Sequence, residues 1–265
     1  MSNSSISLPI RILVLLLLLI IVAPLAVPMM MAVSDTPFLS FPPQGFTLRW
    51  FERVLLNREV QGSFLFSLQL AGWATIAALL LGVPAAAALV RHEFPGRSGI
   101  VALMLSPVIV PLIVTGVALL QLFSSLGWAD TMTQLVIGHT VVCLPYVVRS
   151  VTASLVLVNR DLEDAAAVLG APPHRVLTRI VWPQVRPGIL AGAVFSFVVS
   201  FDDYPISMWL ADGRHFPIPL YLHGLLERSI DPSIAAISTL VILFALLLVV
   251  LIEKVFGISV ARLAT

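Results

Sequence analysis

Long apolar stretches recur along the chain and are separated by short polar connections. A transmembrane helix needs roughly 20 mostly apolar residues, and six stretches meet this length. They cover residues 12–33, 63–90, 98–126, 131–157, 188–210 and 232–252. The second, third and fourth stretches are longer than a bilayer requires, so we expect these helices to tilt or to project beyond the hydrocarbon. The pattern predicts an all-α, polytopic membrane protein with six transmembrane helices in a single domain over residues 1–265.

The composition supports this prediction and excludes other classes of protein. Hydrophobic residues make up 59% of the chain and charged residues only 11%, with a mean hydropathy of +1.04. Soluble domains contain about 45–50% apolar and about 25% charged residues, so a soluble enzyme and a disordered chain are both excluded. Fifteen basic residues oppose 14 acidic ones, which leaves no strongly basic face for nucleic acid. A single cysteine, Cys143, permits no internal disulfide bond.

The orientation follows from the basic residues between the apolar stretches. The first stretch follows Arg11 and is longer than the ~7–15 residues of a signal-peptide core, so a retained signal-anchor helix is favoured over a cleaved signal peptide. With the N-terminus in the cytoplasm, nine Lys and Arg residues lie inside and five outside. Because cytoplasmic loops carry the basic excess, we expect both termini to be cytoplasmic, residues 159–187 cytoplasmic, and residues 34–62 and 211–231 external.

Two features modify this simple arrangement of straight helices. Residues 47–57 form an amphipathic pattern outside the membrane, and we expect a short interfacial helix with Trp50 and Phe51 at headgroup level. Pro107 and Pro111 lie four residues apart in the third stretch, where each removes a backbone hydrogen bond and bends the helix. The bend serves either to shape the helix or to border a cavity in which the freed carbonyls find partners.

The segment 159–188 predicts two capped helices below the membrane. Asp161 can act as the N-cap of the first helix, and Gly170 can adopt the left-handed conformation that ends it. A second helix is expected to begin at Pro173, which suits a first turn, and to end at Pro183. A connection that only returned the chain to the membrane would be short and polar, so this two-helix unit needs a surface to pack against.

Small and acidic residues mark the surface of the first of these helices. Ala165 and Ala166 leave a shallow face that another protein can approach closely, and Glu163 and Asp164 give that face polarity. We therefore predict a contact with a partner protein here.

The same segment resembles the EAA loop of ABC-importer permeases. The family pattern is Glu-Ala-Ala, three residues, Gly, nine residues and Ile-x-Leu-Pro, and this chain has Asp164-Ala165-Ala166, Gly170 and Ile180-x-Trp182-Pro183 at the same spacing. It differs in two identities, Asp for Glu and Trp for Leu. Residues 46–50, 139–149 and 200–203 also resemble the spermidine/putrescine permeases of the PotC type.

The resemblance implies a type I ABC-importer permease fold and a set of partners. Glu163, Asp164, Ala165, Ala166, Gly170 and Pro183 would form the loop that docks into an ATP-binding subunit. Two such subunits, a second permease that is homologous or identical, and an extracytoplasmic solute-binding protein would complete an importer in the bacterial inner membrane. A polyamine is the expected solute, while related permeases are associated with iron, phosphonates and other small solutes. A homodimeric and a heterodimeric pore both stay open.

The sequence carries no recognisable chemistry of its own. The only lysine, Lys254, is followed by Val255, so there is no Gly-x-x-x-x-Gly-Lys-Ser/Thr loop for ATP. The five histidines form no paired metal-binding spacing, so neither a metal nor a cofactor is expected, and His139 is interpreted as a hydrogen-bonding helix residue. An intramembrane enzyme is the alternative from another class, but an enzyme has no need of the EAA-like loop.

Two adjacent acids, Asp202 and Asp203, fall inside the fifth apolar stretch. A carboxylate at the centre of a membrane helix costs about 2.5–3.5 kcal/mol on insertion scales, so such groups face a water-filled cavity or a partner. We predict that one of them lines a solute pathway, with Tyr204 supplying a hydroxyl or an aromatic face for a cation. The alternative is a purely structural pair that bonds to a neighbouring helix, and the sequence does not decide which acid faces the pathway.

Overall fold

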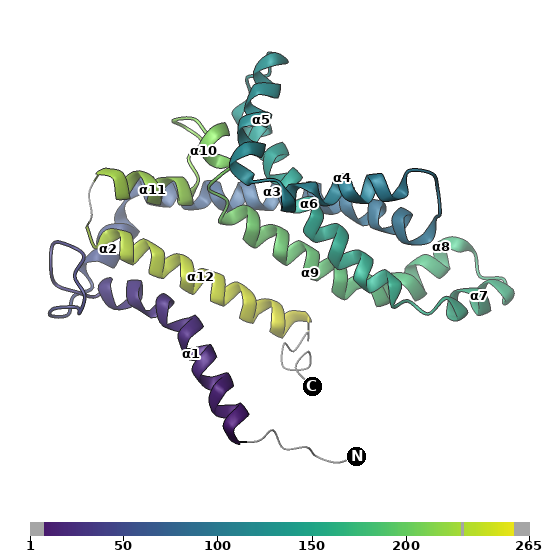
Figure 1. The fold of residues 1–265 in the computed structure, drawn as a ribbon, viewed down its shortest axis with the longest axis horizontal. Helices are drawn as coiled ribbons and strands as arrows, with labels where there is room; N and C mark the ends of the chain where they lie inside the picture. Colours follow the sequence, from purple (N-terminus) through teal and green to yellow (C-terminus); the bar gives the residue numbers. More distant parts are fainter. Residues whose placement is uncertain (1–7, 229–230, 257–265) are drawn as a thin grey trace. The chain divides into compact units, whose positions relative to one another are not determined.

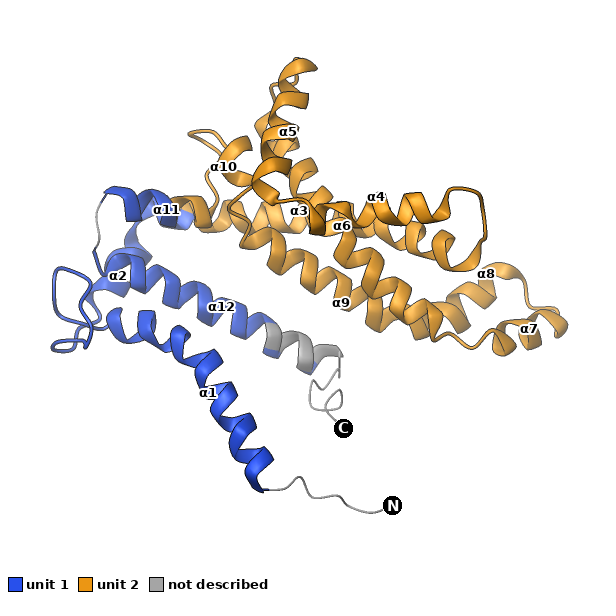
Figure 2. Cartoon of the chain, viewed as in Figure 1, with its two compact units in different colours: residues 1–61, 222–255 blue, residues 62–221, 256–265 orange. Residues whose placement is uncertain are grey.

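The computed structural model describes residues 8–228 and 231–256, and its regular elements in these ranges are helices (Figure 1). The chain divides into two compact units (Figure 2). Unit 1 consists of residues Met1–Gln61 and Leu222–Val255, and unit 2 of residues Gly62–Tyr221 and Phe256–Thr265. Both chain ends, and Arg262 from the predicted basic excess, lie outside the described residues.

Helices cover the six apolar stretches, but the third and the fifth stretch are each interrupted. The helices are α1 (Leu8–Met31), α2 (Arg49–Leu56), α3 (Arg58–Arg91), α4 (Arg97–Ile109), α5 (Leu112–Ser125), α6 (Thr131–Val156), α7 (Arg160–Val168), α8 (Pro173–Val176), a π-helical turn (Leu177–Val181), α9 (Trp182–Phe201), α10 (Ser207–Leu210), α11 (Ile218–Arg228) and α12 (Ser233–Phe256). Among the described residues, four helices are long and apolar enough to cross a membrane, or five if a bent pair counts as one, and Ser233–Leu248 is a shorter apolar helix.

Unit 1 contains the predicted short helix α2, and Trp50 of this helix packs inside the unit. Trp50 is only 6% exposed, and its indole Nε1 donates to the carbonyl of Ser34 at 2.8 Å. The ring is thus packed within unit 1, and its position at headgroup level stays a prediction. Because a buried indole N–H needs an acceptor, the loop carbonyl of Ser34 draws the ring inward. Arg49 covers the ring, with its guanidinium carbon 4.6 Å from the ring centroid, and pairs with Asp35 at 3.1 Å.

The third apolar stretch is broken, as its prolines predict. Helices α4 and α5 meet at 109° across a short break, with Pro107 inside α4 and Pro111 at the N-cap of α5. Pro111 cannot donate a hydrogen bond, and its ring restricts the backbone of Val110, which is extended with ψ 132°. The stretch 98–126 is thus two helices rather than one straight span.

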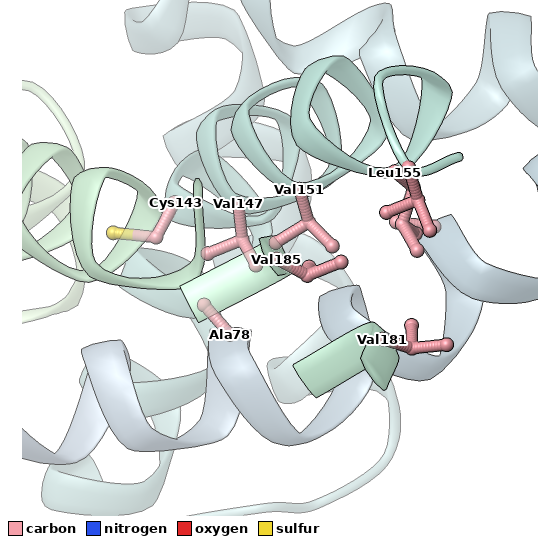
Figure 3. Packing of buried hydrophobic residues seen from close by; sticks show 9 residues of the cluster. Ala78, Cys143, Val147, Val151, Leu155, Val181 and Val185 are labelled. Atoms are coloured by element: carbon pink, nitrogen blue, oxygen red, sulfur yellow. The ribbon is translucent and has the colours of Figure 1, made fainter. Parts of the chain in front are cut away.

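The core of unit 2 forms where α6 packs along α9, with α3 against them (Figure 3). The buried cluster consists of Ala78, Ala86, Cys143, Val147, Val151, Leu155, Val158, Val181 and Val185. Valines dominate it, because branched side chains with one preferred rotamer fill a helix interface at little entropic cost. Val181 and Val185 bring the start of α9 into this cluster, so the N-terminal end of that helix is anchored to α6.

Glycines allow this close approach of α9 to α6. A Cβ atom on Gly188 would lie 2.6 Å from the carbonyl oxygen of Ser150 and would also collide with the side chain of Ser154. A Cβ on Gly192, one turn further, would lie 3.1 Å from the Cα of Val147. Small residues four apart let two membrane helices pack backbone to backbone, and here they fix the position of α9.

Candidate functional site

The first helix of the segment 159–188 is α7, and both its ends are closed by local hydrogen bonds. Asn159 is the N-cap, since its side chain accepts from the backbone of Asp161 at 2.9 Å. The expected cap at Asp161 is therefore wrong by two residues, because an Asn in extended backbone caps equally well. At the other end Gly170 has φ +78°. Ala171 N donates to Ala166 O and Gly170 N to Ala167 O, each at 3.0 Å, which completes a Schellman motif.

The second helix does not end at Pro183, contrary to our expectation. Helix α8, the π-helical turn and α9 form one continuous helix, Pro173–Phe201, of 29 residues. Trp182 N bonds back five residues to Leu177 O, so the helix widens just before Pro183 and accommodates a residue without an N–H. The segment therefore has no break between its second helix and the fifth apolar stretch.

The outer face of α7 is apolar and exposed. The side chains of Val168 and Leu169 are each 87% exposed and that of Leu162 is 51% exposed, while Ala165 is exposed and Ala166 half-buried. We call Leu162, Ala165, Val168 and Leu169 the α7 face. Asp164 is exposed on the same helix. Apolar side chains this exposed on a helix outside the apolar stretches are typical of a protein contact surface.

The side chain of Glu163 does not lie on the α7 face but contacts Arg91 of α3. Its carboxylate accepts from both terminal nitrogens of Arg91, at 2.8 Å each, and only 14% of the Glu163 side chain is exposed. Of the residues predicted to face a partner, Glu163 is thus engaged within the chain. Arg91 lies 72 residues away in the sequence, and no local pattern could have paired the two.

The two acids Asp202 and Asp203 lie at the end of α9 and not inside a helix, which corrects the expected position. Helix α9 ends at Phe201, Asp202 is its C-cap, and a turn leads to α10. Asp203 is buried, and its Oδ1 accepts from the backbone N–H groups of Ile206 at 2.9 Å and Ser207 at 3.4 Å. Asp202 is exposed, and Tyr204 half-buried. The adjacent carboxylates therefore occupy different environments.

His139 of α6 lies within hydrogen-bond distance of one residue before this turn and one residue after it. Its Nδ1 lies 2.8 Å from Ser200 Oγ and its Nε2 lies 3.1 Å from Ser207 Oγ. Asp203 Oδ1 is 3.9 Å from the same Nε2, and both side chains are almost fully buried. The interpretation of His139 as a hydrogen-bonding residue is confirmed. The sequence analysis did not identify Ser200 and Ser207 as partners of His139. Their short distance along the chain from Asp203 was the available signal, because it places all three residues near one helix end.

Beyond α10 the chain forms an ordered exposed turn at Asp212. Slight burial raises the pKa of this carboxyl, but hydrogen bonds from the backbone of His215 and Arg214 outweigh that effect and hold the pKa well below its ordinary value. The carboxylate accepts from His215 N at 2.7 Å and from Arg214 N at 2.8 Å. The turn at Asp212 thus has a defined shape. It lies at the same end of unit 2 as Asp202.

Helix α7 and the turn at Asp202 lie at opposite ends of one continuous helix. At about 1.5 Å per residue, this helix of 29 residues from Pro173 to Phe201 measures about 43 Å. Figure 1 shows it running from α8 to the end of α9, which packs along α6.

Comparison with known proteins identifies this arrangement. Residues 78–264 match the family model described as "Binding-protein-dependent transport system inner membrane component". The chain belongs to this family. It is therefore the membrane component of a binding-protein-dependent importer, and its apolar helices cross the inner membrane.

Three curated relatives indicate the range of solutes within the family. The chain is 29% identical over 212 residues to the spermidine/putrescine transport system permease protein PotC of Haemophilus influenzae, covering 80% of this chain and 82% of the relative. It is 31% identical over 205 residues to the putrescine transport system permease protein PotI of Escherichia coli, covering 75% and 73%. It is 30% identical over 240 residues to the molybdenum transport system permease protein ModB of Mycobacterium bovis, covering 82% and 89%.

A solved structure shares the fold. It is a bacterial ABC transporter involved in the import of the acidic polysaccharide alginate, superposed with a TM-score of 0.67 over 97% of this chain and 100% of that chain. Sequence identity is 16%, so this likeness concerns the fold alone. It confirms the expected all-α, type I ABC-importer permease fold.

Proposed function

We propose that this permease forms half of the translocation pathway of an ATP-driven importer for a small organic cation, a polyamine of the spermidine or putrescine kind. The observation that carries the substrate class is Asp202, an exposed carboxylate at the end of a membrane helix beside a half-buried tyrosine. A carboxylate that is exposed there is available to attract a cation. Relatives named for polyamines support the same class.

The charge of Asp202 argues against an oxyanion as cargo. A carboxylate attracts a desolvated ammonium group more strongly away from bulk water than in it, and it repels an anion for the same reason. Binding must remain weak enough for release, which suits a single carboxylate with an aromatic neighbour. The molybdenum-transport relative suggests the competing proposal that the cargo is molybdate. The uptake experiment described below tests both proposals.

ATP is hydrolysed on separate subunits, which dock on the α7 face. The sequence has no phosphate-binding loop of its own, whereas α7 exposes Val168 and Leu169 to an unusual degree. Asp164, Ala165, Ala166 and Gly170 shape this contact, and Pro183 lies above it in the helix that runs unbroken into the membrane. Two ATP-binding subunits, a second permease and a solute-binding protein make up the working complex.

The orientation is part of the proposal. Residues 159–187 and both termini lie in the cytoplasm, and residues 34–62 and 211–231 lie outside, as the distribution of basic residues favours. The solute-binding protein then meets the side of the membrane that carries the turn at Asp212, and the ATP-binding subunits meet α7.

Transport by the reconstituted complex tests the substrate. We expect ATP-dependent uptake of radiolabelled spermidine or putrescine into vesicles, with no uptake of labelled molybdate and no competition by it. Uptake of molybdate in place of polyamine would refute the polyamine assignment and leave the importer family unaffected.

Cross-linking tests the docking of the ATP-binding subunit. A photoreactive label on a cysteine at Leu169, in a Cys143→Ser background, should capture that subunit. The same label at Ser98, which is also exposed and on the proposed cytoplasmic side, serves as the control. Equal capture at both positions, or none at Leu169, would show that α7 is not the docking helix.

A further inference from the structure

Two kinds of connection join α7 to the membrane helices of unit 2. The first is covalent, because α7 follows α6 after residues 157–159 and leads through Gly170 into the continuous helix Pro173–Phe201. The second is the ion pair between Glu163, in the first turn of α7, and Arg91, the last residue of α3. Arg160 adds to the second connection, since its Nη2 donates to the carbonyl of Val90 at 3.4 Å.

The geometry of the ion pair fixes the relative orientation of the two side chains. Both terminal nitrogens of Arg91 donate, Nη1 to Oε2 and Nη2 to Oε1 of Glu163, at 2.8 Å each. A bidentate pair fixes orientation as well as distance. Exposed ion pairs contribute little, but only 32% of the Arg91 side chain and 14% of the Glu163 side chain are exposed. The pair is thus shielded from much of the solvent screening that weakens surface pairs.

We infer that the Arg91–Glu163 pair carries movement of α7 to α3, and that Glu163 is a positioning residue that does not contact the ATP-binding subunit. The inference rests on the proposed docking of that subunit to the α7 face. A pull on α7 moves α9 in any case, because the chain is continuous. Helix α3 follows through this pair, and without it the long hydrogen bond from Arg160 to the carbonyl of Val90 remains as the direct contact of α3 with α7.

Charge variants separate this role from docking. Glu163→Gln and Arg91→Gln should each lower spermidine uptake per ATP hydrolysed at least about fivefold, the lower end of measured coupling between two sites. The amount of ATP-binding subunit that copurifies should not change. The double variant Arg91→Glu with Glu163→Arg should recover much of the loss, because it restores opposite charges across the same gap. Matched controls are Arg97→Gln and Glu93→Gln, two exposed charges in the neighbouring connection.

A distance measurement tests the pair independently of transport. Spin labels on cysteines at His92 and Ala167, both exposed and both outside the α7 face, report the separation of the α3 end from α7 in a Cys143→Ser background. In the assembled complex we expect a narrow distance distribution that broadens in Glu163→Gln and in Arg91→Gln and narrows again in the charge-swapped double variant.

Three outcomes would overturn the inference. An unchanged distribution in both single variants would show that the pair does not hold α7. A broadened distribution with unchanged uptake per ATP would show that α3 needs no connection through it. A charge swap no better than the single variants would show that the pairing itself is not what matters. Failure of the proposed docking looks different, since cross-linking from Leu169 in the otherwise native loop would then be absent.

Discussion

Asp202 and Asp203 are adjacent and chemically identical, yet their removal should give opposite phenotypes. Asp202 is exposed and caps the end of α9 through its backbone, whereas Asp203 is buried and accepts two backbone hydrogen bonds through its side chain. We expect Asp202→Asn to lower polyamine uptake without loss of stability. We expect Asp203→Ala to destabilise the protein, and to affect transport only through that loss.

The size of the Asp203 effect follows from the groups left without partners. Asp203→Ala removes the acceptor of Ile206 N at 2.9 Å and of Ser207 N at 3.4 Å. A buried donor without a partner costs about 1–3 kcal/mol, and the second bond is long, so we expect a loss of about 2–4 kcal/mol. Asp203→Asn keeps one oxygen acceptor and should cost about 1 kcal/mol, since a neutral acceptor is weaker. Asp202→Asn should stay within about 0.5 kcal/mol, as for most exposed substitutions.

Stability and transport must be measured on the same preparations. Denaturation of each purified variant in detergent gives the change in the free energy of unfolding, and vesicle uptake normalised to assembled complex gives transport. If Asp203→Ala were as stable as the native protein, the hydrogen bonds of Asp203 would not hold the turn. If Asp202→Asn, fully assembled, imported spermidine at the native rate, Asp202 would not belong to the cation path.

Three further predictions concern the helices around these sites. Gly170→Val should lower substrate-stimulated ATP hydrolysis while leaving membrane insertion intact, because a β-branched residue is strained at φ +78°; unchanged stimulation in purified complexes would contradict the role of this turn. Gly188→Ala should cost about 1–3 kcal/mol in detergent denaturation, the usual penalty of overpacking, and an unchanged midpoint would show that α9 can move away from α6. In a Cys143→Ser background, a reagent that cannot cross the membrane should label a cysteine at Ala129 but not one at Thr178, and the reverse pattern would invert the proposed orientation.

The helical fold and the family could be predicted from the sequence, because they depend on local patterns. Runs of about 20 apolar residues can only satisfy their backbone in a bilayer as helices, and α1, α3, α6 and α9 follow them. The left-handed turn at Gly170 and the break near Pro107 and Pro111 were also predictable. Each of these is decided by the backbone freedom of one residue type.

Local patterns were misleading where a neighbour changed the outcome. Pro183 was expected to end a helix, but the preceding π-helical turn accommodates its missing N–H and the helix continues. The amphipathic pattern around Trp50 gave no sign of the Ser34 carbonyl, to which the buried indole donates. In both places the structure depends on a group that the local sequence pattern does not include: the π-helical turn before Pro183 and the carbonyl of Ser34.

Only the tertiary structure distinguished residues of the same type. It buries Asp203 and leaves Asp202 exposed, and it turns Glu163 toward Arg91 while Asp164 next to it stays on the surface. The partners that decide this, His139 and Arg91, are 61–72 residues away from the groups they contact. Hydrogen bonds and ion pairs act over about 3 Å in space whatever the separation along the chain, so the roles of these carboxylates are set by the packing of α6 and α3 and not by their sequence neighbours.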